Sequence, residues 1–193
     1  MNKLVKPSKI QAPKSNLPMS VRDSAALGGL GGGFGGAWGV PQGDLPDINV
    51  WLALAVQEHP HHAAAKQYWG SVQLDMHMSP HTAVQKIYFC RTTMLGLVRL
   101  LCQPKVVGEG ALQLPAAWAV YQSFRALPVI DLLAEPLDCD AHIAALLTAQ
   151  GTLPARLWTD AYLAALAHSS SLRLVTFDRD FERFNLPRCK VLA

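Results

Sequence analysis

Three aspartates stand where an apolar segment ends or a helix begins. Asp47 lies in DLPDINVWLAL, Asp160 in LWTDAYLAAL and Asp178 in LRLVTFDRDF. Carboxylate oxygens are the ligands that Mg²⁺ and Mn²⁺ prefer. If three carboxylates met without a cation, they would repel one another and raise one another's pKa values, so their convergence would be costly. We therefore predict that Asp47, Asp160 and Asp178 converge to hold a divalent cation.

Each of these acids also has a simpler explanation in its local sequence. Asp47 at the turn before a helix is a suitable N-cap, and Asp160 near a helix start is favoured by the helix dipole. Asn49, two residues after Asp47, could cap the same helix or steady the acid. Taken singly, the acids leave both a structural and a metal-binding role open.

The acids are set within apolar runs that alternate with helical segments. Strands are predicted from Leu45 to the turn at Asp47, at 86–90, within 126–133, at 172–175 and in the closing CKVLA. Helices are predicted at VWLALAVQ, from Thr92 to Pro104, after Asp138 and around Asp160. This alternation predicts an α/β sandwich with a mostly parallel sheet. Such sheets bind ligands at the carboxyl ends of their strands, where Asp47 falls.

The composition indicates one folded domain. The chain has 193 residues, a net charge of +3 and 50% hydrophobic residues, which is enough for one globular core. Residues 1–43 carry scattered lysines and prolines and then ALGGLGGGFGGAWG, a tract that cannot bury enough surface to offset its backbone entropy. We predict a flexible Gly/Pro/Lys-containing leader at 1–43 and one domain at 44–193. The glycines lack the Lys-Ser/Thr of a P-loop, and the modest basic excess permits nucleic acid as a partner without requiring it.

Cysteines and histidines give weaker signals. The four cysteines are far apart and form no CxxC pair, so reduced thiols in an intracellular protein are predicted rather than a zinc site. His59, His61 and His62 open a helix, but Pro60 breaks the helical spacing, so a solvated helix start is favoured over a ligand cluster. No apolar run approaches the roughly 20 residues of a membrane helix, and no secretory signal is recognisable. We predict a cytoplasmic protein with no membrane partner.

Four segments follow one another along the folded part: LPDINVWLAL, RTTMLGLVRLL, WTDAYLAALA and LVTFDRDF. In this order and at these separations they resemble the PIN-domain family, and specifically the VapC-type toxins of bacterial toxin–antitoxin modules. The resemblance covers roughly residues 44–193. It implies a PIN fold, which is a three-layer α/β/α sandwich with a mostly parallel central sheet. It also implies a Mg²⁺- or Mn²⁺-dependent ribonuclease, inhibition by a cognate antitoxin and, as is common in the family, a homodimer.

The resemblance assigns roles to particular positions of this sequence. The family's acids fall on Asp47, Asp160 and Asp178, with Asp180 as an additional ligand. Polar residues that the family often has beside the metal fall on Asn49 and Thr176.

One position departs from the family pattern. Many relatives have a glutamate on the second-motif helix, in a TENGFLR-like segment, where this chain has Met94. A thioether is not a ligand for a hard cation such as Mg²⁺. Some relatives carry glutamine there, so loss of this acid need not abolish activity, although it removes one ligand from the expected set.

Cleavage of a phosphodiester explains why such acids would be gathered. The reaction must neutralise charge on the phosphoryl group and generate a nucleophile from water at neutral pH, and a carboxylate-bound Mg²⁺ supplies both. Arg91, Arg99 and Arg179 are candidates for phosphate contacts, and a surface ion pair is the alternative for Arg99.

Three hypotheses follow from this reading. The first is an endoribonuclease toxin that uses a metal-activated water. The second is a catalytically weakened PIN-fold protein that binds RNA or an antitoxin, because Met94 replaces an acid. The third is a phosphatase with Asp47 as a covalent nucleophile, although DIN stands here in place of the expected DxD.

Overall fold

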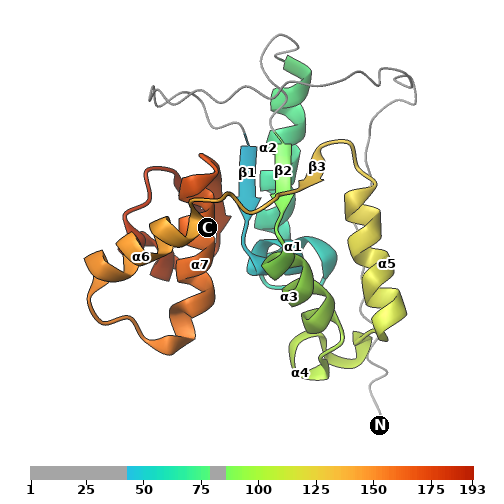
Figure 1. The fold of residues 1–193 in the computed structure, drawn as a ribbon. Coiled ribbons are helices and arrows are strands. Elements are labelled where there is room, and N and C mark those ends of the chain that lie inside the picture. Colours follow the sequence, from blue (N-terminus) through green and yellow to red (C-terminus); the bar gives the residue numbers. More distant parts are fainter. Residues whose placement is uncertain (1–42, 79–85) are drawn as a thin grey trace.

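Five short strands form one sheet at the centre of the structure (Figure 1). The structure is a computed structural model that describes residues 43–78 and 86–193, without the side chains of 73–78. The strands are β1 (Gly43–Pro46), β2 (Lys86–Phe89), β3 (Ile130–Leu132), β4 (Arg173–Thr176) and β5 (Cys189–Val191). The predicted flexible leader, residues 1–43, lies outside the described residues except for Gly43, with which β1 begins.

All neighbouring strands are parallel, and their order in the sheet is β3-β2-β1-β4-β5. The chain builds outward from β1 in one direction through β2 to β3, and then in the other through β4 to β5. The direction reverses between β1 and β4, and ligands of open parallel sheets bind at such a point, outside the carboxyl ends of the strands. The register pairs Pro46 with Val175, which brings Asp47 beside Thr176. The predicted mostly parallel sheet is confirmed.

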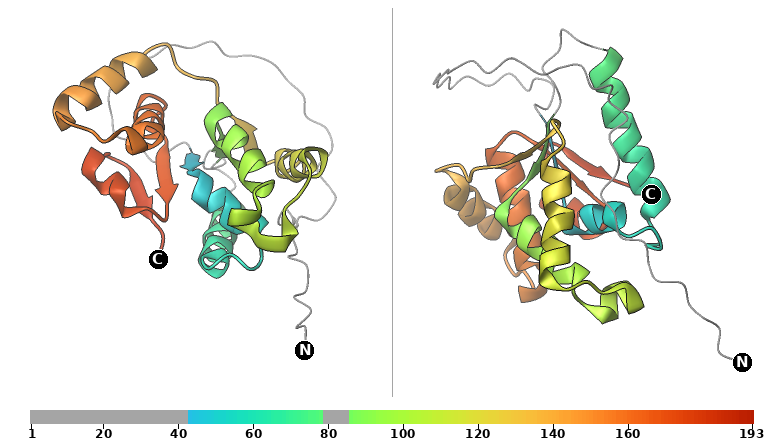
Figure 2. Two further views of the ribbon diagram at one scale, coloured as in Figure 1. Left: turned by 90° about the horizontal axis from the view of Figure 1, so that it is seen from below. Right: turned by 90° about the vertical axis from the view of Figure 1, so that its right-hand side faces the viewer.

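Helices lie on both faces of this sheet (Figure 2). The α-helices are α1 (Ile48–Ala55), α2 (His62–Met78), α3 (Arg91–Leu101), α4 (Pro104–Val107), α5 (Leu114–Arg125), α6 (Cys139–Gln150) and α7 (Trp158–Ser169). Three short 3-10 helices are η1 (Gly108–Gly110), η2 (Ala155–Leu157) and η3 (Arg179–Phe184). Among the described helices, none combines the length and the apolar character needed to cross a membrane.

The strand residues divide between two hydrophobic clusters, one on each face. Ile87 and Phe89 pack in a cluster with residues of α1, α2, α3 and α5, whereas Leu45 and Leu174 pack in a second cluster with residues of α7. Successive side chains of a strand point to opposite faces, so a sheet covered on both faces needs apolar residues in both registers. The predicted three-layer α/β/α arrangement is confirmed.

The approach of α3 to α1 depends on Gly96. A Cβ atom at this position would lie 2.6 Å from Cδ1 of Ile48, the first residue of α1. A side chain at Gly96 would force the Ile48 side chain to move, so glycine permits this close approach of α3 to the beginning of α1 without such a shift. The packing therefore holds α3 close to the turn that carries Asp47.

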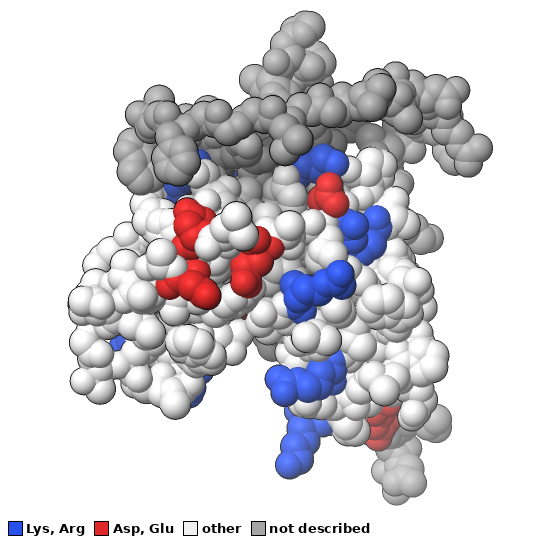
Figure 3. All heavy atoms as spheres, viewed as in Figure 1, with Lys and Arg blue, Asp and Glu red and all other residues white. Residues whose placement is uncertain are grey.

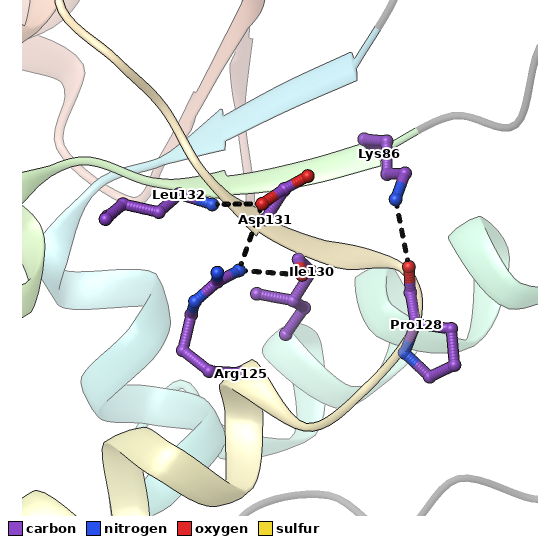
Figure 4. Close-up of polar contacts among 6 residues, drawn as sticks. All are labelled: Lys86, Arg125, Pro128, Ile130, Asp131 and Leu132. Carbon is purple, nitrogen blue, oxygen red and sulfur yellow. Dashed lines mark hydrogen bonds and ion pairs between the residues drawn. The ribbon is translucent and has the colours of Figure 1, made fainter. Parts of the chain in front are cut away.

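The edge strand β3 is held by two basic side chains (Figure 4). Lys86 Nζ donates to the carbonyl of Pro128 at 3.1 Å, and Arg125 Nη1 donates to the carbonyl of Ile130 at 2.9 Å. The same guanidinium lies 3.4 Å from Asp131 Oδ1. Charged side chains on an edge strand also discourage pairing with another chain. These two cations therefore serve the fold.

A buried ion pair joins β1 to β4. Asp44 is completely buried and accepts two hydrogen bonds of 2.8 Å from Arg173, which lies opposite it in the register. Tyr68 of α2 donates a third hydrogen bond to the same carboxylate at 2.8 Å. From the sequence alone, Asp44 marks only the start of the domain. Its local sequence does not point to Arg173, because the register of β1 on β4 sets their pairing.

The start of α6 differs from the expected structure. The sequence predicts a helix after Asp138, and an aspartate directly before a helix is expected to cap it with its side chain. Asp138 does occupy the N-cap position, but its side chain makes no capping hydrogen bond. Its Oδ2 atom instead lies 3.4 Å from Nε2 of His142, one turn along the helix.

Candidate active site

Asp47 occupies the turn between β1 and α1. Its Oδ1 atom accepts a hydrogen bond of 2.6 Å from the amide of Ile48, as an N-cap does, and its own amide donates to Val175 of β4 at 2.8 Å. The carboxylate is buried, with 7% of the residue exposed. The structural explanation, an N-cap, is thus correct for this residue. It does not exclude a ligand role, because the turn lies at the carboxyl end of β1.

The hydroxyl of Thr176 joins the two segments that carry Asp47 and Asp178. Its oxygen lies 3.1 Å from Asp47 Oδ2, 3.1 Å from Asn49 Nδ2 and 3.0 Å from the amide nitrogen of Asp178. The two nitrogens can only donate, so the hydroxyl proton is left for the Asp47 carboxylate. The side-chain oxygen of Asn49 accepts from the amide of Phe177 at 3.3 Å. The network fixes the orientation of Asp47 and the path of the chain after β4.

Burial raises the pKa of Asp47 to about 6. Hydrogen bonds from Ile48 and Thr176 oppose the rise, and repulsion from Asp160 and Asp178 adds to it. Burial also raises the pKa of Asp160, with further repulsion from Asp178. The structure therefore brings the three predicted ligands within electrostatic range of one another. A cation among them would replace this repulsion with attraction.

Asp180 interacts with a cation of the chain itself. Its carboxylate lies 3.1 Å from Nη1 of Arg156, and both side chains are partly exposed to solvent. Its amide donates to Asp178 Oδ1 at 2.8 Å, which forms the start of η3. Arg156 lies in η2 just before α7, and nothing near it in the sequence points to Asp180.

The donor set is suitable for a hard divalent cation, although it is not closed around a common point. Asp47, Asp160, Asp178 and Asp180 supply oxygen ligands alone, which is the chemistry that Mg²⁺ and Mn²⁺ require. Among the side chains that the structure describes, no three His, Cys, Asp or Glu groups come together closely enough to hold a metal ion. The electrostatic coupling of the acids acts over longer distances than coordination does. The residues fit a cation in type, and the cluster is looser than a complete ligand set.

Met94 is a core residue in this structure. It lies in the first cluster of apolar side chains with 8% of its surface exposed. The neighbouring Thr93 is completely buried, and its hydroxyl donates to the carbonyl of Cys90 at 3.1 Å. The position at which many relatives carry an acid therefore contributes packing here.

The three arginines predicted to contact phosphate are exposed. Arg91 and Arg99 lie at opposite ends of α3, and Lys105 follows in α4. Figure 3 shows basic side chains over α3 and α4 on one side of a notch, and acidic side chains gathered on the α6 and α7 side. Arg179 begins η3. In the described part of the chain Arg99 forms no ion pair, so the surface-pair alternative for Arg99 is not supported.

The predicted helix start at the histidines is α2, which begins with His62. His62 Nδ1 lies 2.7 Å from the carbonyl oxygen of Ala53. The ring of His61 stacks on Phe177, with 4.4 Å between the ring centroids. His61 therefore contacts the segment after β4 by packing and His62 contacts α1, roles that their sequence did not indicate.

A family model described as the PIN domain matches residues 45–186. The chain belongs to the PIN-domain family. The match spans most of the chain and includes all four of the candidate acids. The family assignment does not favour the phosphatase hypothesis, which rested on Asp47 alone.

Among characterised PIN-domain proteins, this chain is similar to two ribonucleases of Mycobacterium tuberculosis. It is 37% identical to ribonuclease VapC41 over 153 residues, which are 77% of this chain and 98% of that protein. It is 30% identical to ribonuclease VapC38 over 134 residues, which are 69% of this chain and 84% of that protein.

Solved structures of the family show the same fold at lower sequence identity. VapBC2 from Rickettsia felis, bound to a DNA fragment from its promoter, superposes with a TM-score of 0.53 and 13% identity over 78% of this chain and 98% of that chain. The sarcin-ricin loop cleaving toxin VapC20 of Mycobacterium tuberculosis superposes with a TM-score of 0.51 and 17% identity over 78% of this chain and 99% of that chain.

Proposed function

We propose that this PIN-domain protein is a metal-dependent endoribonuclease and the toxin of a toxin–antitoxin pair. The observation that carries the proposal is the buried carboxylate of Asp47 at the carboxyl ends of β1 and β4, coupled electrostatically to Asp160 and Asp178. The two ribonucleases to which the chain is similar support the same class of reaction.

In this proposal Asp47, Asp160 and Asp178 hold Mg²⁺ or Mn²⁺, with Asp180 as an additional ligand. When bound, the cation would neutralise charge on the scissile phosphate and lower the pKa of a water molecule so that it attacks at neutral pH. Thr176 donates to Asp47 and thereby orients this carboxylate. No side chain of the protein has to act as a covalent nucleophile.

The exposed arginines complete the proposed site. Arg91 and Arg99 on α3, together with Arg179 at the start of η3, contact phosphates of the RNA on either side of the scissile bond. Such contacts position the RNA and carry no sequence information by themselves. This role in binding phosphates also explains why basic side chains line one side of the notch in Figure 3.

The partners of the chain follow from its family. We infer that a cognate antitoxin binds the chain and inhibits it, as the name VapBC implies for the Rickettsia felis structure. We also infer a homodimer, and a cytoplasmic location in which RNA and antitoxin are both present. Sedimentation analysis of the purified chain, alone and with the antitoxin, tests the two assemblies.

One observation favours a second candidate function. Met94 is part of the core, and the described acids do not form a closed ligand set. A PIN-fold protein that binds RNA or an antitoxin and cleaves poorly would have these properties.

The deciding experiment measures Mg²⁺ and Mn²⁺ binding by calorimetry and cleavage of total RNA, on the wild type and on Asp160→Asn. Asparagine keeps the shape of Asp160 and removes its charge, so a purely structural role would largely survive the change. We expect the metal affinity and the cleavage rate each to fall at least tenfold, since even residues behind the ligands cost that much in metal sites.

Two other outcomes would contradict the proposal. Metal binding and cleavage that survive in Asp160→Asn would remove Asp160 from the ligand set. A wild type that binds metal weakly and leaves RNA intact would favour the second candidate function.

A further inference from the structure

A half-exposed tryptophan begins the helix that carries Asp160. Trp158 is the first residue of α7 and is 53% exposed. It belongs to neither apolar cluster, and no ring contact of a described residue involves it. Folding of the domain therefore does not account for this indole, which lies two residues from a predicted metal ligand.

The side of α7 that carries Trp158 is directed toward α3. Residues four apart lie on the same side of a helix, so Tyr162 shows the direction. The hydroxyl of Tyr162 donates to Glu135 at 2.5 Å and is also within hydrogen-bonding reach of the side chain of Thr92 on α3. Asp160 lies on a different side of the helix, where it is coupled to Asp178. The first turn of α7 thus presents a carboxylate to the acid cluster and an indole toward α3.

On the other side of the notch, α3 carries positive charges that can contact the phosphates of a nucleic acid. Arg91 and Arg99 are exposed on α3, and Leu95 between them is 63% exposed. Figure 3 shows this basic line beside the notch that separates α3 and α4 from α6 and α7. An RNA strand that ran from these arginines to Asp160 would reach the first turn of α7, which carries Trp158 as well as Asp160. Cations along a groove and an aromatic ring beside it are the combination by which proteins hold unpaired strands.

We propose that Trp158 stacks on an unpaired base next to the scissile phosphate and so selects single-stranded segments of RNA. This inference rests on the proposed function, because the acids define where the scissile phosphate lies. Bases within a duplex are already stacked on their neighbours and cannot cover the indole, whereas bases of loops and ends can. Trp158 is then a substrate-binding residue that acts on affinity and leaves the chemical step to the carboxylates.

The test uses the full chain and two fluorescent probes of twelve nucleotides, oligoadenylate and an abasic backbone of equal charge. Fluorescence anisotropy in EDTA gives the affinity for each probe without metal-dependent cleavage. We expect the wild type to prefer oligoadenylate and Trp158→Ala to lose about tenfold in affinity for it, with unchanged affinity for the abasic probe. Trp158→Phe should keep most of the preference, because its ring still stacks.

Trp118→Ala is the matched control. Trp118 is 41% exposed on α5, so its removal also deletes an exposed indole, and it should leave the preference unchanged. Circular dichroism verifies that each variant is folded. In Mg²⁺, cleavage of the oligoadenylate by Trp158→Ala should show a KM about tenfold higher and a kcat within about twofold of the wild type.

Three results would overturn the inference. One is an unchanged oligoadenylate preference in Trp158→Ala, and another is a wild type that binds both probes equally. The third is a loss of self-association by Trp158→Ala with RNA binding intact, which would assign the indole to a protein interface.

If the preference holds while Asp160→Asn retains full cleavage, the assignment of the acids fails and the stacking role stands. If Asp160→Asn loses cleavage and the wild type shows no preference for oligoadenylate, the assignment of the acids stands and the stacking role of Trp158 fails.

Discussion

Asp47 is subject to two opposing effects in the absence of a cation. Its hydrogen bonds from Ile48 and Thr176 favour the charged form, while burial and the neighbouring acids favour the neutral form and prevail. The folded-state pKa of about 6 lies above the unfolded value of about 4. The stability that Asp47 contributes is therefore fully present below about pH 4 and is lost as the pH rises through 6.

The first prediction concerns Asp47→Asn without metal. Removing the buried charge should stabilise the chain at pH 7.5 by up to about 3 kcal/mol. The pKa of Asp47 is raised by about two units on folding, and such a rise corresponds to that free energy. The gain should shrink toward pH 4, where the wild-type carboxyl is protonated. Thermal unfolding in EDTA at the two pH values measures both quantities.

Adding Mg²⁺ should reverse this order, since only the wild type then gains from the cation. A variant less stable than the wild type at pH 7.5 in EDTA would mean that the cap of α1 outweighs the buried charge, and the first prediction would be wrong.

At the scale of elements, the pairing of β1 with β4 depends on a charge that has no access to solvent. Asp44 is 0% exposed, and its two bonds to Arg173 span 129 residues of sequence. Removing one member of a buried pair leaves the other uncompensated, which costs more than removing both. The same strand pair positions Asp47 against Thr176, so the ion pair supports the candidate site from the other end of the strands.

The second prediction follows from this pair. Arg173→Met should destabilise the chain by about 3 kcal/mol, because the completely buried carboxylate of Asp44 loses two charge-assisted hydrogen bonds and the positive charge beside it. The double variant Asp44→Leu, Arg173→Met should recover part of the loss. Urea unfolding of both variants and the wild type measures the difference. If the double variant were less stable than Arg173→Met, the penalty would not lie in the uncompensated charge.

At the scale of the whole molecule, β1 is both the first described element and the centre of the sheet. Its neighbours are β2 and β4, and its hydrogen bonds with them join the two halves of the sheet (Figure 1). The domain predicted at 44–193 begins within this strand, one residue after Gly43.

The third prediction tests this boundary by truncation. A chain that begins at Gly43 should unfold at the same temperature as the full chain, because all the described contacts remain. A chain that begins at Ile48 lacks β1 and Asp47 and should not fold cooperatively. Calorimetric scans of the three chains make the comparison. A large loss of stability on removing residues 1–42 would contradict the prediction that they form a separate leader.

The sequence by itself determined the order of strands and helices and the positions of the acids along them. Hydrophobic periodicity is a local property, so the runs before Asp47 and Asp178 were recognisable as strands without any knowledge of their partners. The acid in the first turn of α7 was recognisable in the same way. These local signals predict the mostly parallel sheet, and the PIN-domain family came from the resemblance of four segments to that family.

Only the tertiary structure decided what each side chain contacts. Thr176 joins Asp47, Asn49 and Asp178 because the register of β1 on β4 brings distant segments together, and no local pattern encodes that register. The pairing of Asp44 with Arg173 has the same origin. The exposure of Trp158 likewise depends on which neighbours pack against α7, since helical spacing identifies a face and not its partner. Contacts between residues far apart in sequence are set by packing of the whole domain, and they decide how the acids and the indole are arranged.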